Sequence, residues 1–115
     1  IHVGGAAGLH IQGTEVLTKV ATEEEAIQVI AAVMQMYREG GWYLERIYKW
    51  MARIGLDTIR VATVDDLDSR SALFARFVKS QETAQIDPWA ERATGGVAAG
   101  EFAPMATLPM EMAAE

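Results

Sequence analysis

The sequence predicts an α+β fold that is mostly helical, with a small N-terminal β element, three to four helices and an irregular C-terminal tail. Three observations support this prediction. Glycines interrupt short β-branched runs over residues 1–20, apolar residues then recur at intervals of three and four up to about residue 83, and no sustained period follows residue 94. A chain of 115 residues buries about two-thirds of its unfolded surface, so one core without disulfides is feasible.

The N-terminal β element is predicted as three short strands, at residues 1–3, 9–11 and 15–20. The tripeptide Gln12-Gly13-Thr14 predicts the turn between the last two, because Gly13 adopts positive φ without a Cβ clash. The sequence opens inside an alternating apolar run and shows no basic-then-apolar leader. We therefore expect a piece of a longer polypeptide that is entered at or inside a strand.

The first helix is predicted to begin after Thr22 and to end at Gly40-Gly41. Thr22 and Glu25 have the spacing of a capping box, in which the Thr22 hydroxyl accepts from the Glu25 amide and the Glu25 carboxylate reaches back to the Thr22 amide. The apolar stripe expected to face the core is Ala26, Ile27, Ile30, Val33, Met34 and Tyr37.

Further helices are predicted from about residue 42 to 54 and from an Asp65 or Asp66 cap to about residue 83. Glu45 and Lys49 are four apart in the favourable order on the former. Residues 56–64 fit either a short helical turn or an extended segment. The expected apolar faces are Leu44, Ile47, Tyr48, Met51 and Ile54, flanked by Tyr43 and Trp50, and then Leu67, Leu73, Phe74, Phe77 and Val78.

The C-terminal part of the chain loses this periodicity. Asp87-Pro88-Trp89 predicts a turn, because the residue before proline avoids the α region. From residue 94 onward the sequence is rich in Gly, Ala, Pro and Met, a composition that buries too little apolar surface to offset the entropy of ordering. We therefore predict a domain over residues 1–92 and an extended or mobile tail over residues 93–115.

Composition excludes several classes of function. A formal charge of −6 and a pI near 4.9 argue against a nucleic-acid partner, which requires clustered Lys and Arg. No apolar run approaches the roughly 18 residues that span a bilayer, so no membrane partner is predicted. The chain has no cysteine, which removes disulfides, thiolate catalysis and iron–sulfur ligation together.

The motifs that carry chemistry elsewhere are incomplete in this sequence. The run from Gly4 to Gly8 lacks the middle glycine of G-x-G-x-x-G and precedes strand-like residues, so it predicts a tight turn against which another chain segment or a flat cofactor passes closely. His2 and His10 make at most half a zinc shell. The acidic clusters at residues 23–25 and 65–68 are helix starts, and no serine lies in a nucleophile elbow. We predict no catalytic, cofactor-binding or metal-binding residue in this chain.

A series of short strings occurs in one order along nearly the whole chain, over roughly residues 1–108. The strings are Gly4-Gly5-Ala6-Ala7-Gly8-Leu9, Gly13-Thr14-Glu15-Val16-Leu17, Met36-Tyr37-Arg38-Glu39, Tyr43-Leu44-Glu45-Arg46 with Trp50, Arg53-Ile54-Gly55-Leu56, Phe77 with Ser80-Gln81, Asp87-Pro88-Trp89-Ala90-Glu91-Arg92, and Glu101-Phe102 with Pro104-Met105-Ala106. This order resembles the C-terminal end of the large subunit of bacterial NAD(P)H-dependent siroheme nitrite reductases.

The resemblance implies a parent enzyme of the cytoplasm that reduces nitrite to ammonium. In that family electrons pass from NAD(P)H to FAD, and then through a [4Fe–4S] cluster to siroheme, and a Rieske-like small subunit accompanies the large one. The cluster cysteines, in C-x5-C and C-x3-C arrangements, would lie before Ile1. The resemblance therefore implies a supporting fragment whose partner is the rest of the large subunit. An unpaired strand edge would also favour a homo-oligomer.

The alternative interpretation is a free-standing helical interaction module. Trp42, Tyr43, Tyr48 and Trp50 make the segment 42–54 rich in aromatic residues, and such residues at helical spacing serve as core or as a protein interface. The two interpretations differ in what precedes Ile1, since only the first requires cluster cysteines there.

Overall fold

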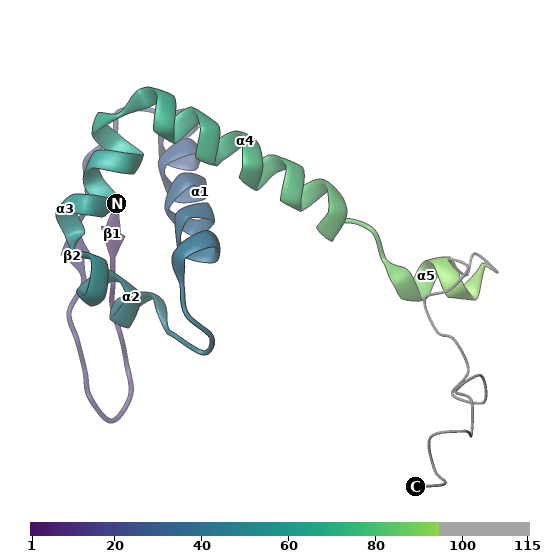
Figure 1. Cartoon of the computed structure of the whole chain (residues 1–115), viewed down its shortest axis with the longest axis horizontal. Helices are drawn as coiled ribbons and strands as arrows, with labels where there is room; N and C mark the ends of the chain where they lie inside the picture. Colours follow the sequence, from purple (N-terminus) through teal and green to yellow (C-terminus); the bar gives the residue numbers. More distant parts are fainter. Residues whose placement is uncertain (95–115) are drawn as a thin grey trace, which may run out of the picture. The chain divides into compact units, whose positions relative to one another are not determined.

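The computed structural model describes residues 1–94 (Figure 1). They divide into two units, Ile1–Thr83 and the described part of Ala84–Glu115. The fold is α+β and mostly helical, as predicted. The elements are β1 (His2–Val3), β2 (Glu15–Val16), α1 (Glu23–Gly40), α2 (Ile47–Ile54), α3 (Leu56–Arg60), the π-helical turn η1 (Val61–Asp65), α4 (Leu67–Ala84) and α5 (Pro88–Ala93). The division expected between residues 92 and 93 stays a prediction, and the tail lies outside the described residues.

The β element is one hairpin with a long connection. β1 pairs antiparallel with β2, His2 opposite Val16, and an isolated bridge joins Ala6 to Gln12. The prediction of a strand at residues 9–11 and of a turn at 12–14 was therefore wrong. Because Ala6 and Gln12 already pair, residues 7–11 form the reversal, and Leu9 and Ile11 at this tip are exposed.

Two sets of hydrogen bonds hold the hairpin in place. The Ile1 ammonium group donates to the Thr18 carbonyl at 2.8 Å. The Arg60 guanidinium of α3 donates to the carbonyls of Leu17 and Val16 at 3.1 and 3.2 Å. These bonds replace ladder partners for the chain that leaves β2, so the hairpin is held by a helix rather than by further strands.

α1 begins as predicted but is capped on one side only. The Thr22 hydroxyl accepts from the Glu25 amide at 3.2 Å. The reciprocal bond of a capping box is not among the hydrogen bonds of the described residues; the Glu25 carboxylate instead lies 3.7 Å from the Arg70 guanidinium of α4. The carboxylate thus joins two helices rather than closing one.

The core lies where the hairpin, α1, α2 and α3 meet. Its buried apolar residues are Leu17, Val29, Val33, Trp50, Met51 and Ile59. The stripe predicted for α1 was largely wrong, because Ile27, Ile30 and Met34 are 51%, 49% and 42% exposed. α1 has apolar residues on more than one face, and the core takes the face of Val29 and Val33.

α2 is shorter than predicted. It begins at Ile47 rather than near residue 42, and residues 42–46 form a loop in which Leu44 has φ +59° and is exposed. Trp50 and Met51 are buried, and Gly55 ends the helix at φ +88°, with its N–H donating to the Met51 carbonyl at 2.8 Å. Gly55 therefore stops α2 as expected.

Residues 56–65 are helical throughout, which settles the alternative left open by their pattern. α3 continues into η1, where the Asp66 amide donates to the Val61 carbonyl at 2.9 Å, five residues back. Ile59 and Thr63 are fully buried, and the Thr63 hydroxyl donates to the Ile59 carbonyl at 2.8 Å. A π-helical turn of this kind re-aims a helix by one residue.

α4 begins at the predicted cap, since the Asp66 carboxylate accepts from the Ser69 amide at 2.9 Å. Of its expected stripe only Leu73 is buried among the described residues, Phe74 and Phe77 are half-buried, and Leu67 and Val78 are exposed. α5 was not predicted: the Asp87 carboxylate accepts from the Trp89 amide at 2.9 Å, and proline at a first helical position is favourable. The turn expected at 87–89 is therefore the start of a helix.

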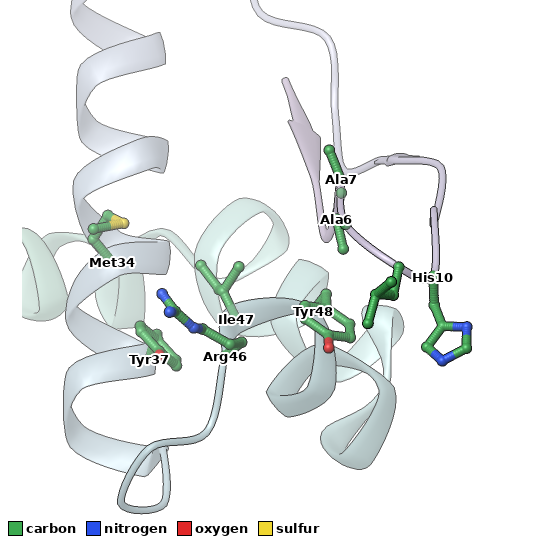
Figure 2. Close-up of a pocket in the computed structure, with 11 residues that line it drawn as sticks. Ala6, Ala7, His10, Met34, Tyr37, Arg46, Ile47 and Tyr48 are labelled. Carbon is green, nitrogen blue, oxygen red and sulfur yellow. The ribbon is translucent and has the colours of Figure 1, made fainter.

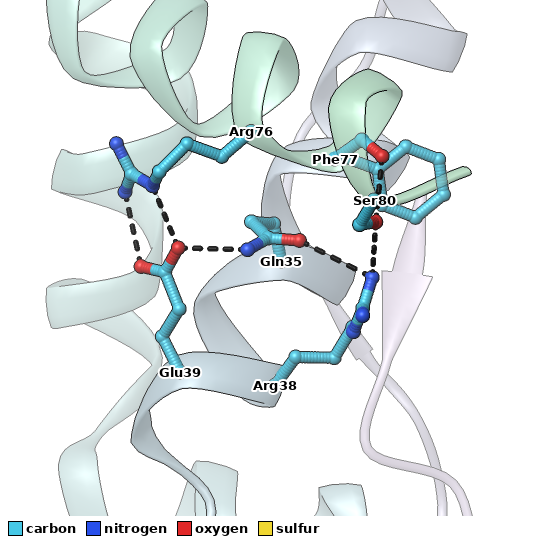
Figure 3. A network of polar contacts seen from close by, with 6 residues as sticks. All are labelled: Gln35, Arg38, Glu39, Arg76, Phe77 and Ser80. Atoms are coloured by element: carbon cyan, nitrogen blue, oxygen red, sulfur yellow. Dashed lines mark hydrogen bonds and ion pairs between the residues drawn. The ribbon is translucent and has the colours of Figure 1, made fainter. Parts of the chain in front are cut away.

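α1 and α4 also meet through polar side chains (Figure 3). The Arg76 guanidinium donates to both Glu39 carboxylate oxygens, at 2.6 and 3.0 Å, and Gln35 donates to Glu39 at 2.7 Å. Arg38 donates to the Ser80 hydroxyl. These hydrogen bonds hold the pKa of Glu39 down at about 2, with Arg76 the largest cause.

Candidate functional site

An open cavity of about 810 Å³ lies between the tip of the hairpin, α1 and the start of α2 (Figure 2). Figure 2 shows Met34 and Tyr37 on the α1 side and His10 on the hairpin side, with Arg46, Ile47 and Tyr48 between them. The lining residues are Gly5, Ala6, Ala7, Gly8, Leu9, His10, Met34, Tyr37, Arg46, Ile47 and Tyr48.

A smaller cavity of about 200 Å³ continues the first toward the start of the chain. Met34 and Ile47 line both cavities, so the two are adjacent, and we call them together the hairpin groove. The smaller cavity is lined by Ile1, His2, Val3, Gly4, Ile30, Val33, Met34 and Ile47. The walls are thus the hairpin on one side and α1 on the other.

Packing inside this unit leaves no room for a side chain at Gly4 and Gly5 of the hairpin. Gly4 has φ +80°, and a Cβ at this position would lie 2.2 Å from Met51 Cε. A Cβ on Gly5 would lie 2.7 Å from Thr14 Cγ2. The close approach of another chain segment is therefore confirmed at Gly4, and that segment is α2. The tight turn predicted for this run was misplaced, because Gly4 and Gly5 precede the bridge at Ala6 and the chain reverses at residues 7–11. Gly4 lets the hairpin sit against the core and so forms the groove wall.

The hairpin groove has few polar side chains. Its lining includes no Asp, Glu, Ser, Thr or Cys, so it offers no carboxylate pair and no Ser, Thr or Cys nucleophile. The Tyr37 hydroxyl is already engaged, donating to the Glu45 carbonyl. The Arg46 side chain forms no hydrogen bond or ion pair within residues 1–94, so a guanidinium without a partner borders a depression whose other polar side chains include His2, His10 and Tyr48.

The two histidines are not brought together into one site. His2 Nδ1 lies 3.1 Å from the Thr14 hydroxyl oxygen and borders the smaller cavity, whereas His10 borders the larger one. Within the part of the chain that the structure describes, no group of three or more His, Cys, Asp or Glu could hold a metal ion. The acidic residues at 23–25, Asp66 and Asp68 lie at helix starts, as expected, whereas Asp65 is the last residue of η1.

The loop 42–46 beside the groove is held by one carboxylate. Glu45 accepts from Nε and Nη2 of Arg53, at 2.8 and 2.7 Å, and from the Trp42 amide at 3.0 Å. Arg53 also donates to the Gly40 carbonyl at 2.8 Å. The hydrogen bond from Arg53 is the main reason that the pKa of Glu45 is lowered to about 2. The expected Glu45–Lys49 pair is not formed, because Glu45 lies outside α2.

The aromatic residues predicted as one helical set are divided by the structure. Trp50 is buried in the core, and Tyr48 lines the groove. Trp42 and Tyr43 are exposed on the loop, where the Arg53 guanidinium lies 4.0 Å from the centroid of the Trp42 ring. The cation–π contact could not be found from sequence, because it depends on the chain leaving helical geometry at Gly41.

Residues 1–94 contain no helix that is both long and apolar enough to cross a membrane. The unit Ile1–Thr83 is a small α+β fold with a surface groove between its hairpin and α1. Residues 1–70 match the family described as the nitrite and sulphite reductase 4Fe-4S domain, and the chain belongs to this family.

Two curated relatives from Bacillus subtilis (strain 168) agree with this assignment. A nitrite reductase [NAD(P)H] is 36% identical over 91 residues, which are 77% of this chain and 11% of that enzyme. An assimilatory nitrate reductase electron transfer subunit is 32% identical over 73 residues, 64% of this chain and 9% of that protein. The chain thus spans about a tenth of each relative's length. No solved structure matches it.

The residues present do not fit the iron–sulfur cluster in the family's description. A [4Fe–4S] cluster is held by four cysteine thiolates, and the sequence contains no cysteine. The described residues offer no alternative group of ligands. The chain therefore belongs to the family although its own sequence lacks the cysteines that hold the cluster.

Proposed function

We propose that this chain is a C-terminal supporting segment of a siroheme nitrite reductase large subunit and carries no catalytic residue itself. The observation that carries the proposal is the family match over residues 1–70 in a chain without a cysteine. The 36% identity to a nitrite reductase [NAD(P)H] supports the same parent activity. The groove, which lacks carboxylates and nucleophiles, supports a binding role.

In this proposal the parent reduces nitrite to ammonium in the cytoplasm with electrons from NAD(P)H. FAD, the [4Fe–4S] cluster and siroheme are bound by other parts of the large subunit, and a Rieske-like small subunit is its partner. The present chain braces the cofactor-bearing part from outside, in the way that a surrounding shell orients the ligands of a metal site. Its apolar core and the bond from Arg60 to the hairpin suit that role.

A replacement experiment tests the proposal. The segment of the Bacillus subtilis nitrite reductase [NAD(P)H] that matches this chain is replaced by the full 115-residue chain, and nitrite reduction and iron content are measured. We expect the deletion of the segment to abolish both and the replacement to restore them. A replacement enzyme as inactive as the deletion would overturn the proposal.

The isolated chain provides a second measurement. After anaerobic incubation with iron, sulfide and siroheme, we expect no visible absorption bands to remain with the purified chain. A coloured, iron-loaded chain would contradict the absence of ligands, since it would require a donor set other than thiolate.

An interaction module that acts alone is the second candidate function. It is favoured by the exposed residues Trp42, Tyr43 and Leu44 on one loop, since an exposed apolar cluster of this kind suits a protein contact. This function does not require a nitrite reductase parent. It therefore predicts no restoration of activity in the replacement enzyme.

A further inference from the structure

We infer that the hairpin groove is the surface on which the cysteine-bearing polypeptide of the 4Fe–4S domain docks. The inference rests on the proposed function and names the surface and the partner through which that function is exerted. The partner contributes apolar side chains and a carboxylate, and it holds the cluster that this chain cannot hold.

The first observation is an apolar helix face with no partner in this unit. Ile27, Ile30 and Met34 follow each other at spacings of three and four on α1, and about half of each side chain is exposed. Ile30 and Met34 line the groove, so the face continues into a hollow rather than standing alone. Contiguous exposed apolar surface of this kind marks a binding site.

The second observation is the free cation. Arg46 borders the larger cavity, and its guanidinium has no partner within residues 1–94. An arginine that becomes covered in an interface requires a hydrogen-bonding anion, because an unpaired buried charge is costly. A carboxylate matches the guanidinium in two parallel hydrogen bonds. The docking surface therefore specifies one acidic group in the partner.

The third observation is the charge pattern around the groove. The chain has a formal charge of −6, yet no Asp or Glu lines either cavity. Acidic residues lie on other surfaces, and Arg46 is the Lys or Arg side chain in the lining of the groove. A groove that is apolar with a positive edge is complementary to an apolar segment that carries a carboxylate.

The family assigns the occupant. Residues 1–70 belong to a 4Fe–4S domain, and four thiolates must come from polypeptide other than these cysteine-free residues. The nitrite reductase [NAD(P)H] that this chain resembles extends well beyond the matched segment, which is 11% of its length. Such a relative contains additional polypeptide, and the hairpin groove is an apolar surface of this unit that is hollowed to receive it.

The cysteine-free sequence makes a direct test available. A thiol introduced as Met34→Cys is the only one in the isolated chain, and Val78→Cys on α4 is a matched control because both wild-type side chains are 42% exposed. Each variant is labelled with a maleimide as the isolated full chain and within the replacement enzyme. Mass spectrometry of the labelled peptide separates these thiols from those of the Bacillus subtilis part.

We expect the Met34→Cys thiol to react about tenfold or more slowly in the replacement enzyme than in the isolated chain, because a thiol buried in an interface reacts only when the interface opens. The Val78→Cys thiol should react at the same rate in both. An active replacement enzyme in which Met34→Cys stays as reactive as in the isolated chain would overturn the inference and leave the proposed function intact. An inactive replacement enzyme would overturn both.

Two further outcomes concern other occupants and Arg46. Protection of Met34→Cys that is already present in the isolated chain, and that is lost on dilution, would assign the groove to a second copy and overturn the inference.

In the replacement enzyme, Arg46→Glu should lower iron content while Lys49→Glu on the neighbouring helix should not. Equal iron content in the two variants would contradict the predicted carboxylate.

Discussion

The ring of Tyr37 on α1 meets the indole of Trp50 on α2 edge-on, with ring centroids 5.4 Å apart and planes at 64°. The Tyr37 hydroxyl also donates to the Glu45 carbonyl in the loop before α2. One side chain thus fixes both the helix and the loop that leads into it. Since Tyr37 lines the hairpin groove, the core and the groove share this residue.

Trp50 and Trp42 should differ sharply when each is replaced by alanine. Trp50 is buried in the core, so Trp50→Ala should lower the free energy of unfolding by about 3–5 kcal/mol. Trp42 is exposed and contacts Arg53 through a cation–π interaction, so Trp42→Ala should cost about 1 kcal/mol or less. Denaturant unfolding of the two variants checks this, and equal losses would contradict the core described above.

Gly4 should not tolerate a side chain. In Gly4→Ala the new residue must keep a left-handed backbone conformation, and its Cβ would lie 2.2 Å from Met51 Cε. We therefore expect a loss of about 1–3 kcal/mol in the free energy of unfolding. Gly13→Ala is the matched control, because a Cβ there meets nothing within 4 Å. The two variants are compared by thermal unfolding; a loss at Gly13 as large as at Gly4 would show that hairpin flexibility, not packing, is what the glycines supply.

The stability of the chain should fall with acid below pH 4.5. The pKa values of Glu39 and Glu45 are lowered from 4.5 to about 2, mainly by hydrogen bonds from Arg76 and Arg53. A lowered pKa in the folded state favours folding above the unfolded value and loses this effect as pH falls to the folded value. The double variant Glu39→Gln/Glu45→Gln should therefore have a lower Tm than the wild type at pH 7, with the gap closing between pH 4.5 and 2. A gap that stays constant over this range would contradict the assignment.

The pair Glu39–Arg76 should contribute little by itself. Both side chains are about half exposed, and exposed ion pairs are typically worth about 0.2–1 kcal/mol. A double-mutant cycle of Glu39→Ala and Arg76→Ala measured by urea unfolding should give a coupling energy in this range. A coupling well above it would mean that Gln35 and the neighbouring Arg38–Ser80 bond act with the pair as one network.

Features that depend on neighbouring residues were predicted well from the sequence. The Thr22 and Asp66 caps and the Gly55 stop each rest on contacts within four residues of the chain. The hairpin turn was misplaced because Gly13 is a favourable turn residue, whereas the bridge between Ala6 and Gln12 is a pairing across the hairpin. The start of α2 was misplaced because Glu45 bonds to Arg53 rather than continuing a helix.

The spacing of apolar residues in the sequence could not predict the groove. The exposed face of Ile27 and Ile30 and the buried face of Val29 and Val33 both repeat at three and four residues, so the pattern could not separate core from surface. Whether the Arg46 guanidinium has a partner likewise depends on how the loop before α2 is placed. The sequence did indicate a close backbone approach at Gly4, but Met51 as the neighbour appears only in the fold.

The amino-acid sequence by itself determined the helix boundaries set by local caps, and it excluded thiolate ligands because no cysteine is encoded. These properties depend on short-range bonds or on composition, and no packing can alter them. The tertiary structure decided which apolar face of α1 is buried and which remains at the hairpin groove. That choice depends on the hairpin, α2 and α3 competing for one helix surface, and such competition involves residues far apart in the chain.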